Sequence, residues 1–288
     1  MVCLRAIATI GLLLVQWQAG SAAAGKAPPT LAGKPAEAPR MYLPPERSAA
    51  DVGLGDYITK WWMPIADLEE RGRYAAANAG LGPAGSDRPR VIFLGDSITE
   101  GWKGLESQRF GESPHRVINR GISGQLTLHM LLRLQVDVLH HRPKVMVLLA
   151  GTNDIRIGSN WMSRPTELQM HRLRDNLTSI VDAGRAQGVQ VVLCTLPPVH
   201  DESFDPAQFP VHSTVLRPAE AILAANEMIR QLAATRGLLL ADYHKALSDE
   251  RGLMRREASN DGLHPNERGY ALMLEVLAPL VQRALAVP

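Results

Sequence analysis

The sequence is poor in the residues that would cross-link it or bind it to a charged polymer. Only two of its 288 residues are cysteines, Cys3 and Cys194. A chain that loses its N-terminus therefore keeps one thiol, which allows no internal disulfide and no cysteine-based zinc site. The 31 basic and 29 acidic residues leave a net charge of +2. With no Lys/Arg run, this balance predicts no nucleic-acid partner.

Long apolar runs are also missing. The most apolar stretch, residues 6–15, follows Arg5 and precedes the small residues 21–24. It is shorter than the roughly 18–20 apolar residues that a membrane span needs. A positive charge, a short apolar run and small residues are typical of a signal peptide. We therefore predict a signal peptide at residues 1–24, no membrane span, and a secreted or periplasmic protein. No cysteine lies at the predicted cleavage site, which argues against a lipid-anchored form.

Three further regions follow along the chain. Residues 25–55 are rich in Pro and Ala and predict a linker without regular structure. Residues 56–87 include Trp61 and Trp62 and predict a helical N-terminal extension packed on the main domain. Residues 88–288 are expected to form that domain.

Within the main domain, short apolar runs alternate with longer stretches of helical spacing. The runs predict buried strands at residues 90–95, 117–118, 145–150, 189–194 and 238–241. Helices are predicted at residues 127–139, 168–187, 218–236 and 266–285. This alternation predicts an α/β fold, a three-layer α/β/α sandwich around a parallel sheet. The Cys194 thiol lies in a predicted buried strand, so we expect it to be an inert core group.

The polar loops after the first three strands should meet at one rim, because ligands of such sheets bind at the carboxyl ends of the strands. Ser97 follows the first strand at the start of a predicted helix, where free N–H groups favour a developing anion. The alternative is that Ser97 caps that helix.

A serine nucleophile needs a base, and His264, three residues after Asp261, is the best candidate. The alternative is a surface turn that caps the last helix. His244, two residues after Asp242, is a second candidate base.

Two residues could stabilise an oxyanion. Gly124 can offer a backbone N–H and Asn153 a side-chain N–H. The alternatives are a turn glycine with positive φ at Gly124 and a helix cap or loop hydrogen bond at Asn153.

Taken together, these residues resemble a known family. Four blocks, Gly95-Asp96-Ser97-Ile98-Thr99, Asn119-x-Gly-x-x-Gly124, Gly151-x-Asn153-Asp154 and Asp261-x-x-His264, resemble those of SGNH (GDSL-type) hydrolases in order and spacing. The resemblance implies a flavodoxin-like sheet of about five parallel strands. It also implies a catalytic triad of Ser97, His264 and Asp261, and an oxyanion hole made by Ser97, Gly124 and Asn153. No metal or organic cofactor is implied. Many members carry Asp after the second-block glycine, whereas this chain has Gln125, which puts the support of Gly124 in question.

Within that family the chain is most similar to the platelet-activating-factor acetylhydrolase-like branch, through residues 62–64, the first block and residues 127–133. This implies a serine esterase for short acyl groups, above all acetyl, acting on a small ester or an acetylated extracellular glycan. A homodimer is compatible with the resemblance. Lipid acylhydrolase or lysophospholipase, thioesterase and non-catalytic glycan-binding module are the alternatives. Trp102 and Trp161 are candidates to line a substrate pocket, with simple packing as the alternative.

Overall fold

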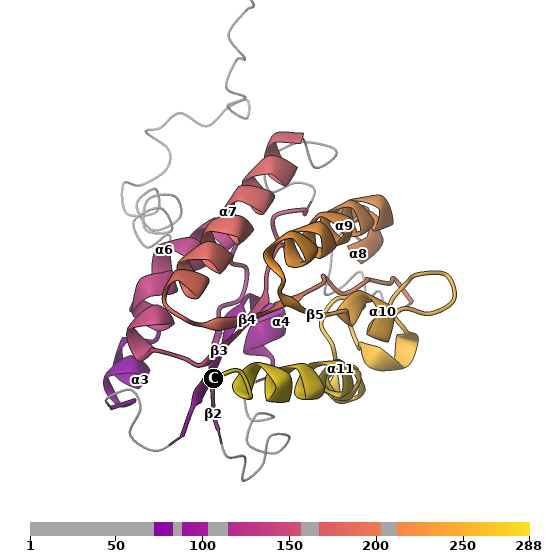
Figure 1. Cartoon of the computed structure of the whole chain (residues 1–288). Coiled ribbons are helices and arrows are strands. Elements are labelled where there is room, and N and C mark those ends of the chain that lie inside the picture. The colour runs from indigo at the N-terminus through magenta and orange to yellow at the C-terminus, as the bar shows by residue number, and fades with distance from the viewer. Residues whose placement is uncertain (1–71, 83–87, 103–114, 157–166, 203–211) are drawn as a thin grey trace, which may run out of the picture. The chain divides into compact units, whose positions relative to one another are not determined.

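A parallel five-stranded sheet forms the centre of the main domain (Figure 1). The computed structural model describes residues 72–82, 88–102, 115–156, 167–202 and 212–288. The strands lie in the order β2-β1-β3-β4-β5, and every adjacent pair is parallel. Their bounds are β1 Arg90–Gly95, β2 Arg116–Gly121, β3 Val145–Leu149, β4 Gln190–Cys194 and β5 Leu239–Ala241. The predicted flavodoxin-like sandwich is confirmed.

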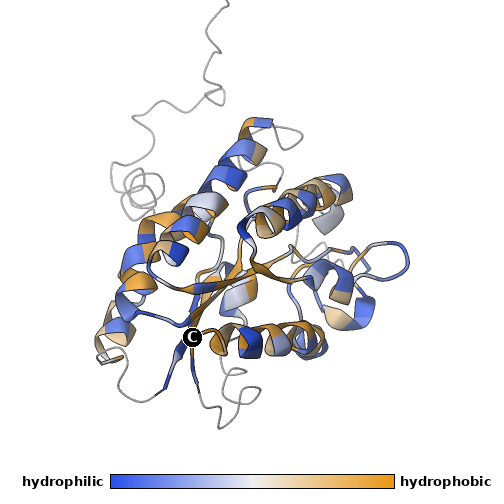
Figure 2. Cartoon of the chain, viewed as in Figure 1, coloured by the Kyte–Doolittle hydropathy of each residue, from blue (hydrophilic) through white to orange (hydrophobic). Residues whose placement is uncertain are grey.

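The central strands β1, β3 and β4 are largely apolar on both faces, as expected where helices cover both sides of a sheet (Figure 2). Helices α6, α7 and α9 lie on one side, and α11 lies on the other (Figure 1). Each of the four predicted long helices is present: α6 Thr127–Asp137, α7 Glu167–Ala186, α9 Ala219–Arg236 and α11 Glu267–Leu285. The short helices are α3 Ala75–Ala79, α4 Ser97–Glu100, α8 Ser213–Leu216 and α10 Tyr243–Leu247, with 3-10 turns η2 Leu139–His141 and η3 Arg256–Ala258.

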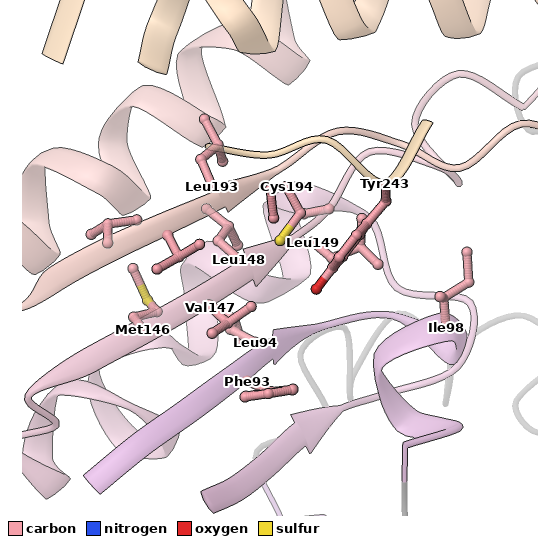
Figure 3. Packing of buried hydrophobic residues seen from close by; sticks show 14 of the residues in the cluster. Phe93, Leu94, Ile98, Met146, Val147, Leu148, Leu149, Leu193, Cys194 and Tyr243 are labelled. Carbon is pink, nitrogen blue, oxygen red and sulfur yellow. The ribbon is translucent and has the colours of Figure 1, made fainter. Parts of the chain in front are cut away.

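The core lies where the central strands meet these helices (Figure 3). All residues of β1 and β3 are buried. Cys194 is fully buried at the end of β4, beside the Tyr243 hydroxyl, and burial raises the pKa of its thiol to about 12. The expected core position of Cys194 is confirmed.

The buried face of α6 does not include all of its apolar residues. Leu128 and Leu132 are apolar residues of α6, yet Leu128 is 47% exposed and Leu132 is 38% exposed. The buried face holds Met130 and Leu134 together with a charged pair, in which Arg133 Nη1 lies 3.2 Å from Asp137 Oδ2. The guanidinium also donates to the Gly95 and Arg120 carbonyls, at 3.1 and 2.8 Å. These strand-end carbonyls explain why a charge replaces an apolar side chain there.

The end of the predicted N-terminal extension contacts the sheet edge. The Tyr74 hydroxyl donates to the Gly121 carbonyl, and the Arg120 guanidinium lies 4.6 Å from the centre of the Tyr74 ring. Asn78 Nδ2 donates to Asp137 Oδ1 at 2.7 Å. The signal peptide, the linker, Trp61 and Trp62 lie outside the described residues. No helix of the described ranges is long and apolar enough to cross a membrane.

The strand order locates the place where a ligand can bind. The chain moves outward from β1 to β2 and then crosses back to β3, so the direction reverses between β1 and β3. Loops that leave the carboxyl ends of these two strands diverge and open a crevice. Ser97 follows β1 and Asn153 follows β3, so both begin at this crevice.

Candidate active site

Ser97 is held at the first residue of α4, directly after β1. The Asp96 side chain caps this helix, accepting from the Ile98 N–H at 3.0 Å. Ser97 is therefore not the cap, and its hydroxyl instead lies 2.9 Å from His264 Nε2. As the first residue of the helix, Ser97 also has a backbone N–H without an acceptor inside α4.

The turn before α11 binds His264 to Asp261 at several atoms. His264 Nδ1 lies 2.7 Å from Asp261 Oδ2, while Asp261 Oδ1 accepts the backbone N–H groups of Leu263 and His264 at 2.9 and 2.7 Å. Ser259 Oγ adds a bond to the His264 carbonyl at 2.7 Å. Gly262 has φ +80°, and a Cβ there would lie 2.0 Å from the His200 carbonyl oxygen, so only glycine fits this turn.

These bonds set the protonation of the pair. Burial raises the pKa of Asp261, but the His264 side chain and the backbone N–H groups of His264 and Leu263 outweigh it and hold that pKa below its ordinary value. An ionised carboxylate only accepts hydrogen bonds, so His264 Nδ1 carries a proton and Nε2 offers a lone pair to the Ser97 hydroxyl. His264 is thus arranged to remove the serine proton. His244, the second candidate base, instead lies with Nδ1 3.3 Å from Ser248 Oγ.

The second and third blocks are joined to each other and to α4. Asn153 Nδ2 donates to the Gln125 carbonyl at 3.1 Å, beside Gly124. Asp154 accepts from the Thr127 N–H and hydroxyl, at 3.0 and 2.5 Å, and so holds the first residue of α6. Glu100 of α4 accepts from the Ser123 N–H at 2.9 Å. This chain of bonds fixes the loop that carries Gly124 relative to both the serine and the asparagine.

Gly124, which ends the second block, and Gln125, which follows it, are explained by different features of the structure. Gly124 has φ +78°, and no atom lies within 4 Å of the position of a Cβ, so the backbone angle rather than crowding requires glycine. Gln125 is buried, and its Oε1 accepts from Arg133 Nε at 2.7 Å. The missing Asp charge is therefore replaced by a neutral acceptor for the buried guanidinium.

Two charged groups of the site are buried. Burial raises the pKa of Asp96 to about 6, although the Ile98 N–H and the charge of Arg217 lower it in part. Asp96 Oδ2 is buried with no hydrogen-bond partner among the described residues. Arg217, which sequence reasoning did not select, donates to the Thr152 carbonyl at 3.1 Å and to Asn153 Oδ1 at 3.2 Å. Nothing in the local sequence indicated that Arg217 would be buried.

The two tryptophan candidates are not alike. Trp102 is only 1% exposed, and its ring packs at 5.7 Å from Phe93 and 4.9 Å from Tyr270, measured between ring centres. Its position favours the packing alternative over a pocket wall. Trp161 lies outside the described residues.

Comparison with known proteins gives consistent matches. The model of the GDSL-like lipase/acylhydrolase family matches residues 93–272. The platelet-activating factor acetylhydrolase IB subunit alpha1 of Pongo abelii is 28% identical over 77% of this chain and 89% of its own length. An acetylxylan esterase of Xylanibacter ruminicola is 25% identical over 68% of this chain and 44% of its own length. A GDSL-like lipase structure from Bacteroides thetaiotaomicron superposes with a TM-score of 0.64 at 27% identity, covering 76% of this chain and 100% of that one.

Proposed function

The chain belongs to the GDSL-like lipase/acylhydrolase family and is a carboxylic ester hydrolase, and from this premise we propose that it works through an acyl-enzyme formed on Ser97. The matched residues contain all four sequence blocks, so the resemblance to SGNH hydrolases is confirmed. The observation that carries the proposed mechanism is the continuous contact from Ser97 Oγ to His264 Nε2, at 2.9 Å, and from His264 Nδ1 to Asp261, at 2.7 Å.

In the proposed first half-reaction, Ser97 Oγ bonds to the ester carbonyl carbon while His264 Nε2 takes the hydroxyl proton. Electron density moves to the carbonyl oxygen, which accepts hydrogen bonds from the Ser97 N–H, the Gly124 N–H and the Asn153 amide. The bond to the leaving alcohol then breaks as the imidazolium gives that oxygen its proton. Asp261, ionised in this turn, stabilises the imidazolium. Water repeats the sequence on the acyl-enzyme, releasing the carboxylic acid and free Ser97.

For the substrate we propose a short acyl ester, above all an acetyl group on extracellular carbohydrate. Two similar proteins are described by acetyl chemistry, as a platelet-activating factor acetylhydrolase and an acetylxylan esterase. The predicted signal peptide supports an extracellular or periplasmic setting, where such a substrate occurs. The predicted domain layout and homodimer remain parts of this proposal.

The test measures the rates of hydrolysis of p-nitrophenyl acetate, butyrate and palmitate, and the release of acetate from acetylated xylan. We expect acetyl ester hydrolysis to be fastest, acetate to be released from xylan, and Ser97→Ala to lower turnover by at least about a thousandfold. Ser179→Ala is the matched control, since the hydroxyl of this exposed α7 serine donates to the Asp175 carbonyl of its own helix.

Other outcomes would select other functions. Faster cleavage of palmitate than of acetate would favour a lipid acylhydrolase, and preference for acyl-thioesters would favour a thioesterase. Near-full activity of Ser97→Ala would reject the proposed nucleophile. Xylan binding without hydrolysis of any ester would favour a glycan-binding module.

A further inference from the structure

Arg217 is a buried cation with no direct counter-ion among the described residues. It joins α8 to α9, and its side chain is 4% exposed. Across the described residues it forms no salt bridge, and its guanidinium donates to the Thr152 carbonyl and to Asn153 Oδ1. Burial lowers its pKa to about 10, with Arg156 adding repulsion and Asp96 and Asp261 opposing it. Burying an unpaired charge destabilises a fold, so the contacts of Arg217 need an explanation beyond packing.

The chemistry of the two side chains fixes which way the Asn153 amide points. An amide can present either its oxygen or its nitrogen to a neighbour, whereas a guanidinium donates hydrogen bonds and accepts none. The atom 3.2 Å from Arg217 Nη2 is therefore Asn153 Oδ1. This leaves Nδ2, with two N–H groups, on the other side. One N–H points to the Gln125 carbonyl at 3.1 Å, and the second has no acceptor among the described residues.

Arg217 itself is held in a defined place. Its backbone N–H donates to the Ser213 carbonyl at 2.9 Å and so ends α8. Pro218 follows directly and restricts the backbone before α9 begins. The guanidinium then contacts two consecutive residues, the backbone of Thr152 and the side chain of Asn153. A fixed donor that contacts both backbone and side chain restricts rotation of the asparagine.

We propose that Arg217 is a positioning residue, which fixes the Asn153 amide with an N–H toward the oxygen of the reacting ester. The inference rests on the proposed function, in which Asn153 stabilises the oxyanion. Its consequence is that the corner between α8 and α9 controls the rate of acyl transfer without touching the substrate. If the guanidinium served the fold alone, its replacement would change kcat by the same factor whether or not Asn153 is present.

The test is a double-mutant cycle on p-nitrophenyl acetate hydrolysis. We expect Arg217→Gln to lower kcat about 10- to 100-fold with little change in KM, because glutamine can present either a donor or an acceptor to Asn153. In the Asn153→Ala background the same change should lower kcat by less than about threefold, because no amide remains to be oriented. Equal losses in the two backgrounds, or no loss in either, would overturn the inference.

Conservative variants separate orientation from folding. Arg217→Lys keeps a group that only donates, so we expect it to retain more activity than Arg217→Gln when Asn153 is present and no more when it is absent. Should Arg217→Gln fail to fold in a thermal melt, the lysine variant in the two backgrounds decides, and equal activity ratios overturn the inference. Arg230→Gln on α9 is the matched control, because it removes a half-buried arginine that pairs with Asp242.

This cycle also distinguishes a failure of the inference from a failure of the proposed function on which it rests. If Ser97→Ala and Asn153→Ala both lower kcat but the Arg217 variants do not, the inference fails and the proposed function stands. If Ser97→Ala retains activity, the proposed function fails first.

Discussion

At the scale of single residues, the site depends on carboxyl groups whose surroundings differ. Asp261 receives hydrogen bonds from His264 and two backbone N–H groups, so its pKa lies below the ordinary value. Asp96, directly after β1, is fully buried and has one oxygen without a partner among the described residues. The same side-chain type is therefore held ionised at one position and resists ionisation at the other.

The buried Asp96 predicts an unusual pH dependence of stability. Its pKa rises from 3.8 to about 6 in the folded protein, so the folded state binds the proton more tightly than the unfolded state. The resulting stability is present below the unfolded pKa and is lost as the pH rises through about 6. Asp96→Asn keeps an oxygen for the Ile98 N–H and cannot ionise. We expect its free energy of unfolding, relative to the wild type, to rise by up to about 3 kcal/mol between pH 4 and 7.

Urea unfolding at several pH values measures this difference. Asp182→Asn is the control, because Asp182 is exposed and its pKa is lowered by Arg236, so its effect should be constant between pH 5 and 7. A difference between Asp96→Asn and wild type that does not change with pH would contradict the account.

At the scale of elements, the sequence located the helices but not always the face they bury. Residues 127–139 predicted a helix, and α6 forms at Thr127–Asp137. Leu128 and Leu132 of this helix are apolar yet exposed, whereas the charged residues Arg133 and Asp137 lie on its buried face with Thr127, Met130 and Leu134. Periodicity counts apolar residues and takes no account of strand-end carbonyls, which here require a donor. The burial of Arg217 was not predicted for the same reason, since its partners are a carbonyl and an amide from a loop distant in sequence.

The buried pair on α6 should contribute strongly to stability. Arg133→Ala leaves Asp137 buried without its charge partner and removes a donor from Gln125 and two carbonyls. We expect a loss of about 3–5 kcal/mol in the free energy of unfolding. Leu128→Ala, on the exposed side of the same helix, should change it by less than about 0.5 kcal/mol. Urea titration checks both, and a loss below about 1 kcal/mol for Arg133→Ala would show that the pair is not needed for the fold.

At the scale of the whole molecule, the parallel sheet brings loops that are distant in sequence together at one site. Five apolar runs separated by helices predicted the sheet, and the confirmed order β2-β1-β3-β4-β5 brings the loops after β1 and β3 to the same crevice. Tyr270 of α11 donates to the Ile98 carbonyl of α4 at 2.8 Å, which ties the histidine-bearing segment to the serine-bearing one. Residues 97 and 264 were predictable as a pair because their blocks resemble a family. The contact of Asp261 with His264 was predicted with them, but the bonds from Ser259 and Tyr270 were not, because they depend on three-dimensional distances.

The most direct test of the account is covalent labelling of Ser97 by a fluorophosphonate, located by peptide mass spectrometry. Only a serine activated by a base reacts quickly with this reagent. We expect one adduct, on the peptide that contains Ser97, with labelling slowed at least about a hundredfold in His264→Ala and unchanged in His244→Ala. An adduct on another residue, or an undiminished labelling rate in His264→Ala, would contradict the central claim that His264 activates Ser97.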